Sequence, residues 1–398
     1  MKTRTGRKNL FKIFKSSAGL ILLIMFGLFI LGGGFMKQSY LEPWDKNYAA
    51  KYTDPRIRLA AAGLLAANNH NMQPWKVKLD KADPMVFYLY ADSLRTTKEV
   101  DPLYRQMMIT QGTFLEYVRV AGEKEGFHAD IAVFPEGEYE EGDLLSSMDK
   151  KPVAKITLSP AKPVESPFYN GMFLADTNRG NYKKKAPDSL QISKLTKLPD
   201  ENGLSIKFYT GKADLYKIGN YVMESAKTEA GVTRVMDESN GIFRANEREK
   251  NKYRWGYSVE GQGVSGIRRY LLQGLITLFP SINEGKGASQ NFIHYTKTAV
   301  DHTPAYAVIT TSGNSRTDQV LSGMLYSRMI LTGHTLGLAM QPLSQVLEEY
   351  PEMKQPYDDF RYDYAGQGQT IQMLLRIGEP ETSAPNSMRR DVLSLIVE

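Results

Sequence analysis

The sequence predicts an α+β protein that is built from two related halves and preceded by one transmembrane helix. Three observations carry this prediction: an uncharged run near the N-terminus, strand-like segments interleaved with helix-like ones, and a glycine spacing that occurs twice. With 398 residues, of which 42% are hydrophobic, the chain is long enough to bury a substantial core.

The predicted transmembrane helix covers residues 18–36, which contain no charged side chain. At about 1.5 Å per residue, a helix of this length spans roughly 28 Å, close to the hydrocarbon thickness of a bilayer. Six basic residues lie in residues 1–17 and only Lys37 follows the run closely, so we expect a cytoplasmic N-terminus and an extracytoplasmic body. No clear small-x-small cleavage site follows. The segment is therefore interpreted as an uncleaved signal anchor in the cell membrane, with residues 37–54 as a connector.

The charge and residue counts exclude several classes of function. The formal net charge of +6 comes from the N-terminus, because removing its six basic residues leaves 44 basic against 44 acidic ones. A neutral body does not favour nucleic-acid binding. The absence of cysteine excludes disulfides and thiolate metal sites, and the five histidines show no paired ligand spacing, so no metal site is predicted.

Hydrophobic periodicity and turn residues locate the elements of the body. Helices are predicted over residues 56–68, 102–124, 213–226 and 319–336, the second with Asp101 as its cap. Strands are predicted over residues 75–79, 85–90, 129–134, 154–158, 204–209, 305–310 and 371–377.

A repeat of glycines suggests that the body arose from two copies of one unit. Gly112, Gly122 and Gly126 are matched at a constant offset of 211 by Gly323, Gly333 and Gly337. In each copy we expect a closely packed helix that ends at the third glycine. The repeat predicts two halves, residues 55–200 and 201–398, that form a pseudo-dimer within one chain, which suits a monomer.

Residues 60–77, AAAGLLAANNHNMQPWKV, resemble the nitroreductase signature, in which a helix and a polar loop with N-x-Q-P-W lead into a strand. Two further segments fall in the order expected of the Acg-like branch of that superfamily: Asp-Thr-Asn-Arg at 176–179, and LLRIGEP followed by Arg389 and Arg390. The resemblance implies an α+β fold with FMN bound between two units, which the Acg-like branch fuses in one chain. It also implies NAD(P)H as the usual electron donor and a small aromatic molecule as the acceptor.

The resemblance assigns eight residues to the cofactor site of this flavoprotein. Asn69 and Asn71 would hydrogen-bond the flavin, Gln73 would support their loop, and Thr177, Asn178, Arg179, Arg389 and Arg390 would surround the phosphate or the ribityl chain. Each of these elements occurs once, so one FMN per chain is expected. No catalytic residue is assigned; Trp75 is expected in the core, and a substrate-side role for His70 is less favoured.

Two alternatives remain beside this interpretation. Residues 261–266 match G-x-G-x-x-G, but the segment before them is a poor parallel strand, which disfavours a Rossmann dinucleotide site. The main prediction is a membrane-anchored oxidoreductase that passes hydride or electrons to a small aromatic or quinone-like acceptor. The alternative is a non-catalytic protein that binds or sequesters flavin beneath a covering segment, residues 231–290.

Overall fold

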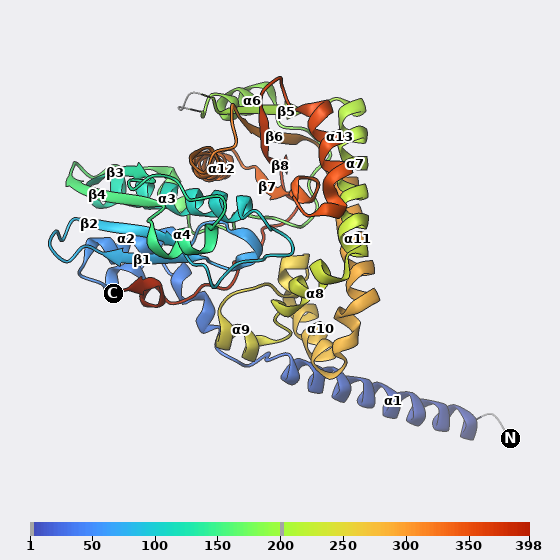
Figure 1. The fold of residues 1–398 in the computed structure, drawn as a ribbon. Helices are drawn as coiled ribbons and strands as arrows, with labels where there is room; N and C mark the ends of the chain where they lie inside the picture. The colour runs from blue at the N-terminus through green and yellow to red at the C-terminus, as the bar shows by residue number, and fades with distance from the viewer. Residues whose placement is uncertain (1–3, 200–202) are drawn as a thin grey trace.

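The computed structural model describes residues 4–199 and 203–398, with side chains from Ala18 onward. The described chain forms a mixed α+β structure with two sheets, which confirms the predicted fold class (Figure 1). The predicted boundary between the halves, at residues 200 and 201, lies outside the described residues, as do the side chains of the basic N-terminus.

The first half supplies most of one sheet and the second half supplies the other. The first sheet has the order β3 (Phe127–Val133), β4 (Ala154–Pro160), β2 (Val86–Ala91), β1 (Trp75–Leu79) and β9 (Ile396–Val397). The second sheet has the order β5 (Ser205–Tyr209), β6 (Tyr306–Thr311), β8 (Thr370–Gly378) and β7 (Ala339–Pro342). Strand β9 pairs with β1 in parallel, so the C-terminal tail returns from the second half to the first.

Two long helices, α3 (Arg105–Glu125) and α12 (Arg316–Thr335), cross at the matched glycines. A Cβ atom at Gly112 would lie 1.8 Å from the carbonyl oxygen of Val320, and one at Gly323 would lie 1.9 Å from that of Ile109. Only glycine permits so close an approach of two backbones. The first matched pair of the repeat therefore has the same packing role in both halves.

Several predicted boundaries are wrong by a few residues, for identifiable reasons. Helix α3 begins at Arg105 rather than at residue 102, because Tyr104 has a left-handed backbone with a φ of 56°. The cap residue is Tyr104 rather than the predicted Asp101, although the Asp101 carboxylate accepts hydrogen bonds from the N–H groups of Gln106 and Met107 at 3.1 and 2.9 Å. Helix α2 (Pro55–Gly63) ends before residue 68, where the chain enters a short turn and then the polar loop.

Sequence periodicity predicted only some of the remaining helices of the described chain. They are α4 (Leu144–Lys150), α5 (Pro167–Gly171), α6 (Ser189–Thr196), α7 (Lys212–Gly231), α8 (Thr233–Gly241), α9 (Glu247–Tyr253), α10 (Gly266–Leu278), α11 (Gly285–Asp301) and α13 (Lys354–Tyr364). Helices α8, α9 and α10 lie in the predicted covering segment, residues 231–290. A Rossmann site requires a strand directly before its glycine motif, but in the described chain the element that precedes residues 261–266 is helix α9.

Helix α1 (Arg4–Leu31) extends away from the body (Figure 1). The predicted helical end at residue 36 is wrong, because the chain turns at residues 32–34, where Gly33 has a φ of 86° and Gly32 packs on the backbone of Tyr270. Within the part of the chain that the structure describes, no helix has both the length and the apolar character needed to cross a membrane.

Candidate functional site

A cavity of about 770 Å³ lies where the two halves meet the segment 231–290. Volumes of roughly 300–1,000 Å³ are typical of sites for cofactors and other small molecules. Six of the eight residues predicted to contact the cofactor line this cavity: Asn69, Asn71, Thr177, Asn178, Arg179 and Arg389. Gln73 and Arg390 lie outside the lining. The fold thus brings the polar loop, the 175–181 loop and the C-terminal tail to one space.

The polar loop after α2 is held in an unusual backbone conformation. His70, Asn71 and Gln73 have φ angles of 47°, 53° and 52°. This left-handed region costs a non-glycine residue roughly 1–3 kcal/mol, and such strain is concentrated at functional sites. The backbone N–H of Asn69 donates to Thr110 Oγ1 on α3 at 3.0 Å, which fixes the loop against the first half.

Arg389 holds this loop from the C-terminal tail. Its Nη1 donates to Asn71 Oδ1 at 2.9 Å, and its Nη2 donates to the carbonyl oxygens of Leu65 and Ala66 at 2.6 and 3.2 Å. The guanidinium also lies 4.6 Å from the centre of the Trp44 ring. Burial lowers the pKa of Arg389 to about 10, so the group is charged at neutral pH. Its Nε is buried and has no hydrogen-bond partner in the described chain.

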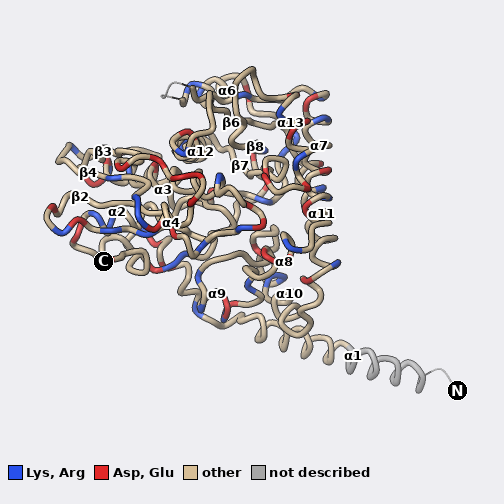
Figure 2. The backbone as a smooth tube through the Cα atoms, in the orientation of Figure 1, with Lys and Arg blue, Asp and Glu red and all other residues tan. Residues whose placement is uncertain are grey.

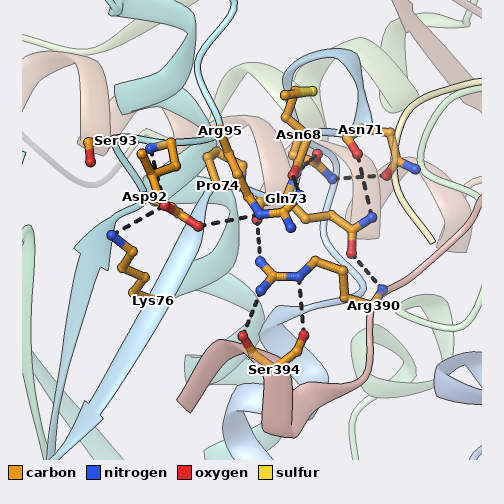
Figure 3. Close-up of polar contacts among 12 residues, drawn as sticks. Asn68, Asn71, Gln73, Pro74, Lys76, Asp92, Ser93, Arg95, Arg390 and Ser394 are labelled. Carbon is orange, nitrogen blue, oxygen red and sulfur yellow. Dashed lines mark hydrogen bonds and ion pairs between the residues drawn. The ribbon is translucent and has the colours of Figure 1, made fainter. Parts of the chain in front are cut away.

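Gln73 and Arg390 support the loop from behind the cavity (Figure 3). Arg390 donates through its backbone N–H to Gln73 Oε1 at 2.8 Å and through Nη1 to the Gln73 carbonyl oxygen at 3.2 Å. The same guanidinium reaches Ser394 Oγ and its carbonyl oxygen at 3.1 and 2.6 Å. Gln73 thus contacts the C-terminal tail outside the cavity lining, and its role in supporting a flavin site remains a prediction. The predicted contact between Arg390 and a phosphate remains a prediction, since the groups that Arg390 reaches belong to the protein itself.

The 175–181 loop is fixed by hydrogen bonds to the second half. Asn178 donates through Nδ2 to the carbonyl oxygen of Thr382 at 2.7 Å and accepts from Gly180 N–H at 2.8 Å. Arg376, fully buried on β8, donates through Nη2 to the carbonyl oxygens of Asn178 and Gly180 at 3.2 and 2.6 Å. Both polar ends of the Asn178 side chain are therefore used by the chain, and its role is to shape the loop.

Arg179 differs from its neighbours because no hydrogen bond or ion pair occupies its guanidinium in the described chain. The side chain lines the cavity and remains accessible there, while the surrounding protein lowers its pKa by desolvation. His70 lies near enough that the Arg179 charge adds to burial in lowering the histidine pKa to about 4. The imidazole is therefore neutral at neutral pH, and Arg179 is a cation that faces open space.

Two buried carboxyl groups face the same cavity. Glu229 at the end of α7 and Glu348 after β7 are each 5% exposed, and the Oε2 atom of each lacks a partner in the described chain. Burial raises the pKa of Glu229 to about 8, although the positive charge of Arg179 acts in the opposite direction. Burial and the charge of Glu229 also raise the pKa of Glu348 well above its ordinary value. Glu229 therefore holds a proton at neutral pH, and the environment of Glu348 also favours its protonated form.

A buried ionic cluster ties the covering segment to the end of α1. Lys250 pairs with Glu247 at 2.5 Å and with Glu260, and all three side chains are largely buried. Tyr40 donates its hydroxyl to Glu247 Oε2 at 2.7 Å, and the Glu247 N–H donates to the Gly32 carbonyl oxygen at 3.3 Å. Since Tyr40, Lys250 and Glu260 also line the cavity, this cluster fixes one of its walls.

Sequence reasoning missed Glu229, Glu348 and Arg376. The arginine gave a usable signal, because it is the one charged residue of a largely apolar strand and a charge in such a strand needs buried partners. The two glutamates gave none. Glu229 ends a polar helix and Glu348 stands beside Glu349, a pattern that is typical of a solvated surface.

Comparisons with known proteins come from solved structures alone, since no family model and no curated protein matches the chain. A nitroreductase-like family protein from Bacillus cereus shares 13% identity over 60% of this chain and 98% of that chain, with a TM-score of 0.31. A nitroreductase with bound FMN from Desulfitobacterium hafniense shares 11% identity over 57% and 96%, with a TM-score of 0.30. An FMN-dependent nitroreductase from Mycobacterium smegmatis in complex with NADPH shares 12% identity over 52% and 83%, with a TM-score of 0.29. At this distance a likeness assigns neither cofactor nor reaction to this chain.

Proposed function

We propose that the cavity binds one FMN per chain and that the protein is an FMN-dependent oxidoreductase of the nitroreductase type. In this proposal it passes hydride or electrons to a small aromatic or quinone-like acceptor. The observation that carries the proposal is Arg179, a cation that faces the cavity without a partner in the described chain. A phosphate complements such a group through charge-assisted hydrogen bonds.

The other polar groups of the cavity fit a flavin as well. A flavin ring offers both donors and acceptors along its pyrimidine edge. Arg389, Gln345 and Gln372 line the cavity, and each has one buried polar atom without a partner in the described chain, Nε in Arg389 and Oε1 in the two glutamines. The resemblance of residues 60–77 and 176–179 to the nitroreductase pattern supports the same cofactor.

The chain's own residues suit a site for redox chemistry. Bound FMN supplies reversible hydride and electron transfer. Glu229, whose pKa of about 8 keeps it protonated at neutral pH, can donate a hydrogen bond or a proton to an acceptor that gains electrons. His70 stays neutral and so does not repel Arg179 or a second cation nearby.

Flavin binding is tested by titrating the purified full-length chain with FMN and measuring the flavin-to-chain ratio. We expect a ratio of one, because the sequence contains a single polar loop and a single Asp-Thr-Asn-Arg segment, the one that ends at Arg179. A ratio of two would contradict the single site. A chain that binds no FMN at all would contradict the cofactor assignment.

Turnover is tested separately, by anaerobic stopped-flow reduction of the holoprotein with NADH, NADPH or a reduced quinone. Reoxidation by a quinone or a nitroaromatic follows. We expect at least one donor to reduce the flavin and one acceptor to reoxidise it at catalytic rates. The alternative is a protein that sequesters flavin without turnover. The buried Lys250 cluster favours this alternative, because the cluster fixes the cavity wall that the covering segment forms. A flavin that responds only to dithionite would favour this alternative.

We also propose that residues 18–36 attach the protein to the lipid bilayer of the cell membrane. The N-terminus is placed in the cytoplasm, and the body is placed outside it as a monomer. The support is the uncharged sequence of residues 18–36 and the basic residues before it. Protease added to spheroplasts should cleave the body, and protection of the body beside a cleaved outward-facing control would contradict this topology.

A further inference from the structure

Helix α10 packs antiparallel against the C-terminal end of α1. A Cβ atom at Gly274 would lie 2.1 Å from the carbonyl oxygen of Leu28, and one at Gly32 would lie 2.1 Å from that of Tyr270. Each helix thus uses a glycine to let the backbone of the other approach, as helices packed within membranes do. The rings of Phe29 and Tyr270 meet edge to face with centroids 5.0 Å apart.

The two helices share one boundary between charged and uncharged residues. Residues 18–31, the part of α1 whose side chains the structure describes, carry no charge (Figure 2). The first charged residue after them is Lys37. In α10, Arg268 and Arg269 stand in the first turn, and residues 270–283 contain no charge. Because the helices are antiparallel, these arginines lie towards the Lys37 end. From that end, the uncharged parts of both helices run in the same direction. Helices that enter a bilayer have this arrangement, with charged residues at the interface and uncharged residues in the hydrocarbon core.

The exposure of the apolar side chains indicates what covers them. Residues 20–26 of α1 are all exposed, and Leu23 is 69% exposed. Successive residues of a helix are turned by about 100° from one another, so these side chains point to every side. A protein partner would cover one face, whereas a lipid phase covers all of them. Leu278 and Phe279, at the end of α10, are 50% and 56% exposed.

We propose that α10 enters the lipid bilayer beside α1, with Leu278 and Phe279 in contact with lipid and Arg268 at the water boundary. The proposal rests on the attachment of residues 18–36 and extends it to a segment far along the chain. Both flanks of α10 line the cavity, through Ser265 before the helix and Asn283 after it. Contact of α10 with lipid therefore brings the cavity wall to the membrane surface, where lipid-soluble quinones are dissolved.

The absence of cysteine allows a direct test, since a single introduced cysteine can be spin-labelled without background. The full-length chain is reconstituted in vesicles of phosphatidylcholine and phosphatidylglycerol, with labels at L278C and F279C on α10. L22C on α1 reports the proposed attachment itself. L94C and L190C are matched controls, because both leucines are exposed and belong to neither α1 nor α10. Leu190 lies on α6, at the opposite end of the body from α1 (Figure 1). Power-saturation EPR compares the collision of each label with oxygen, which concentrates in lipid, and with a water-soluble nickel complex.

We expect the labels at 278 and 279 to behave like the label at 22, with high oxygen and low nickel accessibility, and those at 94 and 190 to show the reverse. If the labels at 278 and 279 showed the accessibility of the label at 94 while the label at 22 remained in lipid, the insertion of α10 would be overturned. The attachment of residues 18–36 would stand. An aqueous label at 22 would remove both. Low accessibility to both reagents with dipolar coupling between labels would mean that a second copy of the chain covers this face, which also overturns the proposal.

Discussion

The cavity has two unlike regions. In the loop that carries Asn71, the polar atoms are largely occupied by the tail, through Arg389 in front and Arg390 behind. Around Arg179 and Glu229, charged or ionisable groups keep free polar atoms in the same cavity. The first region has the features of a scaffold that maintains a strained loop, and the second has those of a surface prepared for a ligand.

This difference shows that a motif can mark two kinds of residue at once. The nitroreductase-like segments include residues that shape the cavity and residues that face into it, and the sequence does not distinguish them. The free groups are the better candidates for contact with a ligand, because an occupied donor must lose one partner before it gains another. The two regions should therefore respond differently to substitution.

The largest effect is expected from Arg389→Ala, which should destabilise the whole body. The substitution removes the donor to the part-buried Asn71 Oδ1 and to the buried carbonyl oxygens of Leu65 and Ala66. Breaking a buried, charged hydrogen-bond network costs about 3–5 kcal/mol. Urea unfolding of the full chain in mild detergent should show this loss, together with weaker FMN binding.

Two further variants sharpen this test. Arg248→Ala, at an exposed position on α9, should leave the unfolding midpoint unchanged. Arg389→Lys keeps the charge but not the forked donors and should recover part of the stability. An Arg389→Ala protein with wild-type stability and lost FMN affinity would mean that Arg389 belongs to the ligand region rather than to the scaffold.

Arg179→Ala should show the opposite behaviour, with weaker FMN binding and unchanged stability. The guanidinium makes no hydrogen bond or ion pair in the described chain, so little native structure is lost with it. Loss of charged hydrogen bonds to a phosphate costs about 1.5–3 kcal/mol, or roughly 10- to 150-fold in the dissociation constant. Titration followed by flavin fluorescence measures the change, with exposed Arg361→Ala on α13 as the control. Equal affinity in both variants would place the phosphate away from Arg179.

The sequence predicted the long elements of the fold well, because their periodicity and glycines act locally. Strand β1 was predicted with its observed bounds, and Trp75 is in the core, where its ring packs 5.2 Å from that of Phe114. The paired glycines 112 and 323 meet where α3 and α12 cross. Such features depend on a residue and its near neighbours, which a sequence shows directly.

The parts that the sequence could not predict depend on which distant segments meet. Glu229 becomes a buried acid only because α7, the 175–181 loop and the stretch after β7 converge on one cavity. The free state of Arg179 and the occupied state of Asn178 likewise follow from tertiary contacts, since the two residues are adjacent in the sequence. The early end of α1 follows from its packing on α10.

A third effect, the most specific to the ligand region, is expected in the pH dependence of stability. The pKa of Glu229 is raised from 4.5 to about 8, so between these values the folded chain holds a proton that the unfolded chain has released. Stability from this group therefore falls as pH rises through the window and is constant above about pH 8. One bound proton changes the unfolding free energy by at most about 1.4 kcal/mol per pH unit. Glu229→Gln cannot ionise, so its unfolding free energy should fall less steeply than that of the wild type between pH 5 and 7. Glu224→Gln, exposed on the same helix, should retain the wild-type slope. Urea unfolding at several pH values measures the slopes of all three proteins. Identical slopes for wild type and Glu229→Gln would show that Glu229 is ionised in the folded chain. The cavity around Glu229 would then be more polar than its burial indicates.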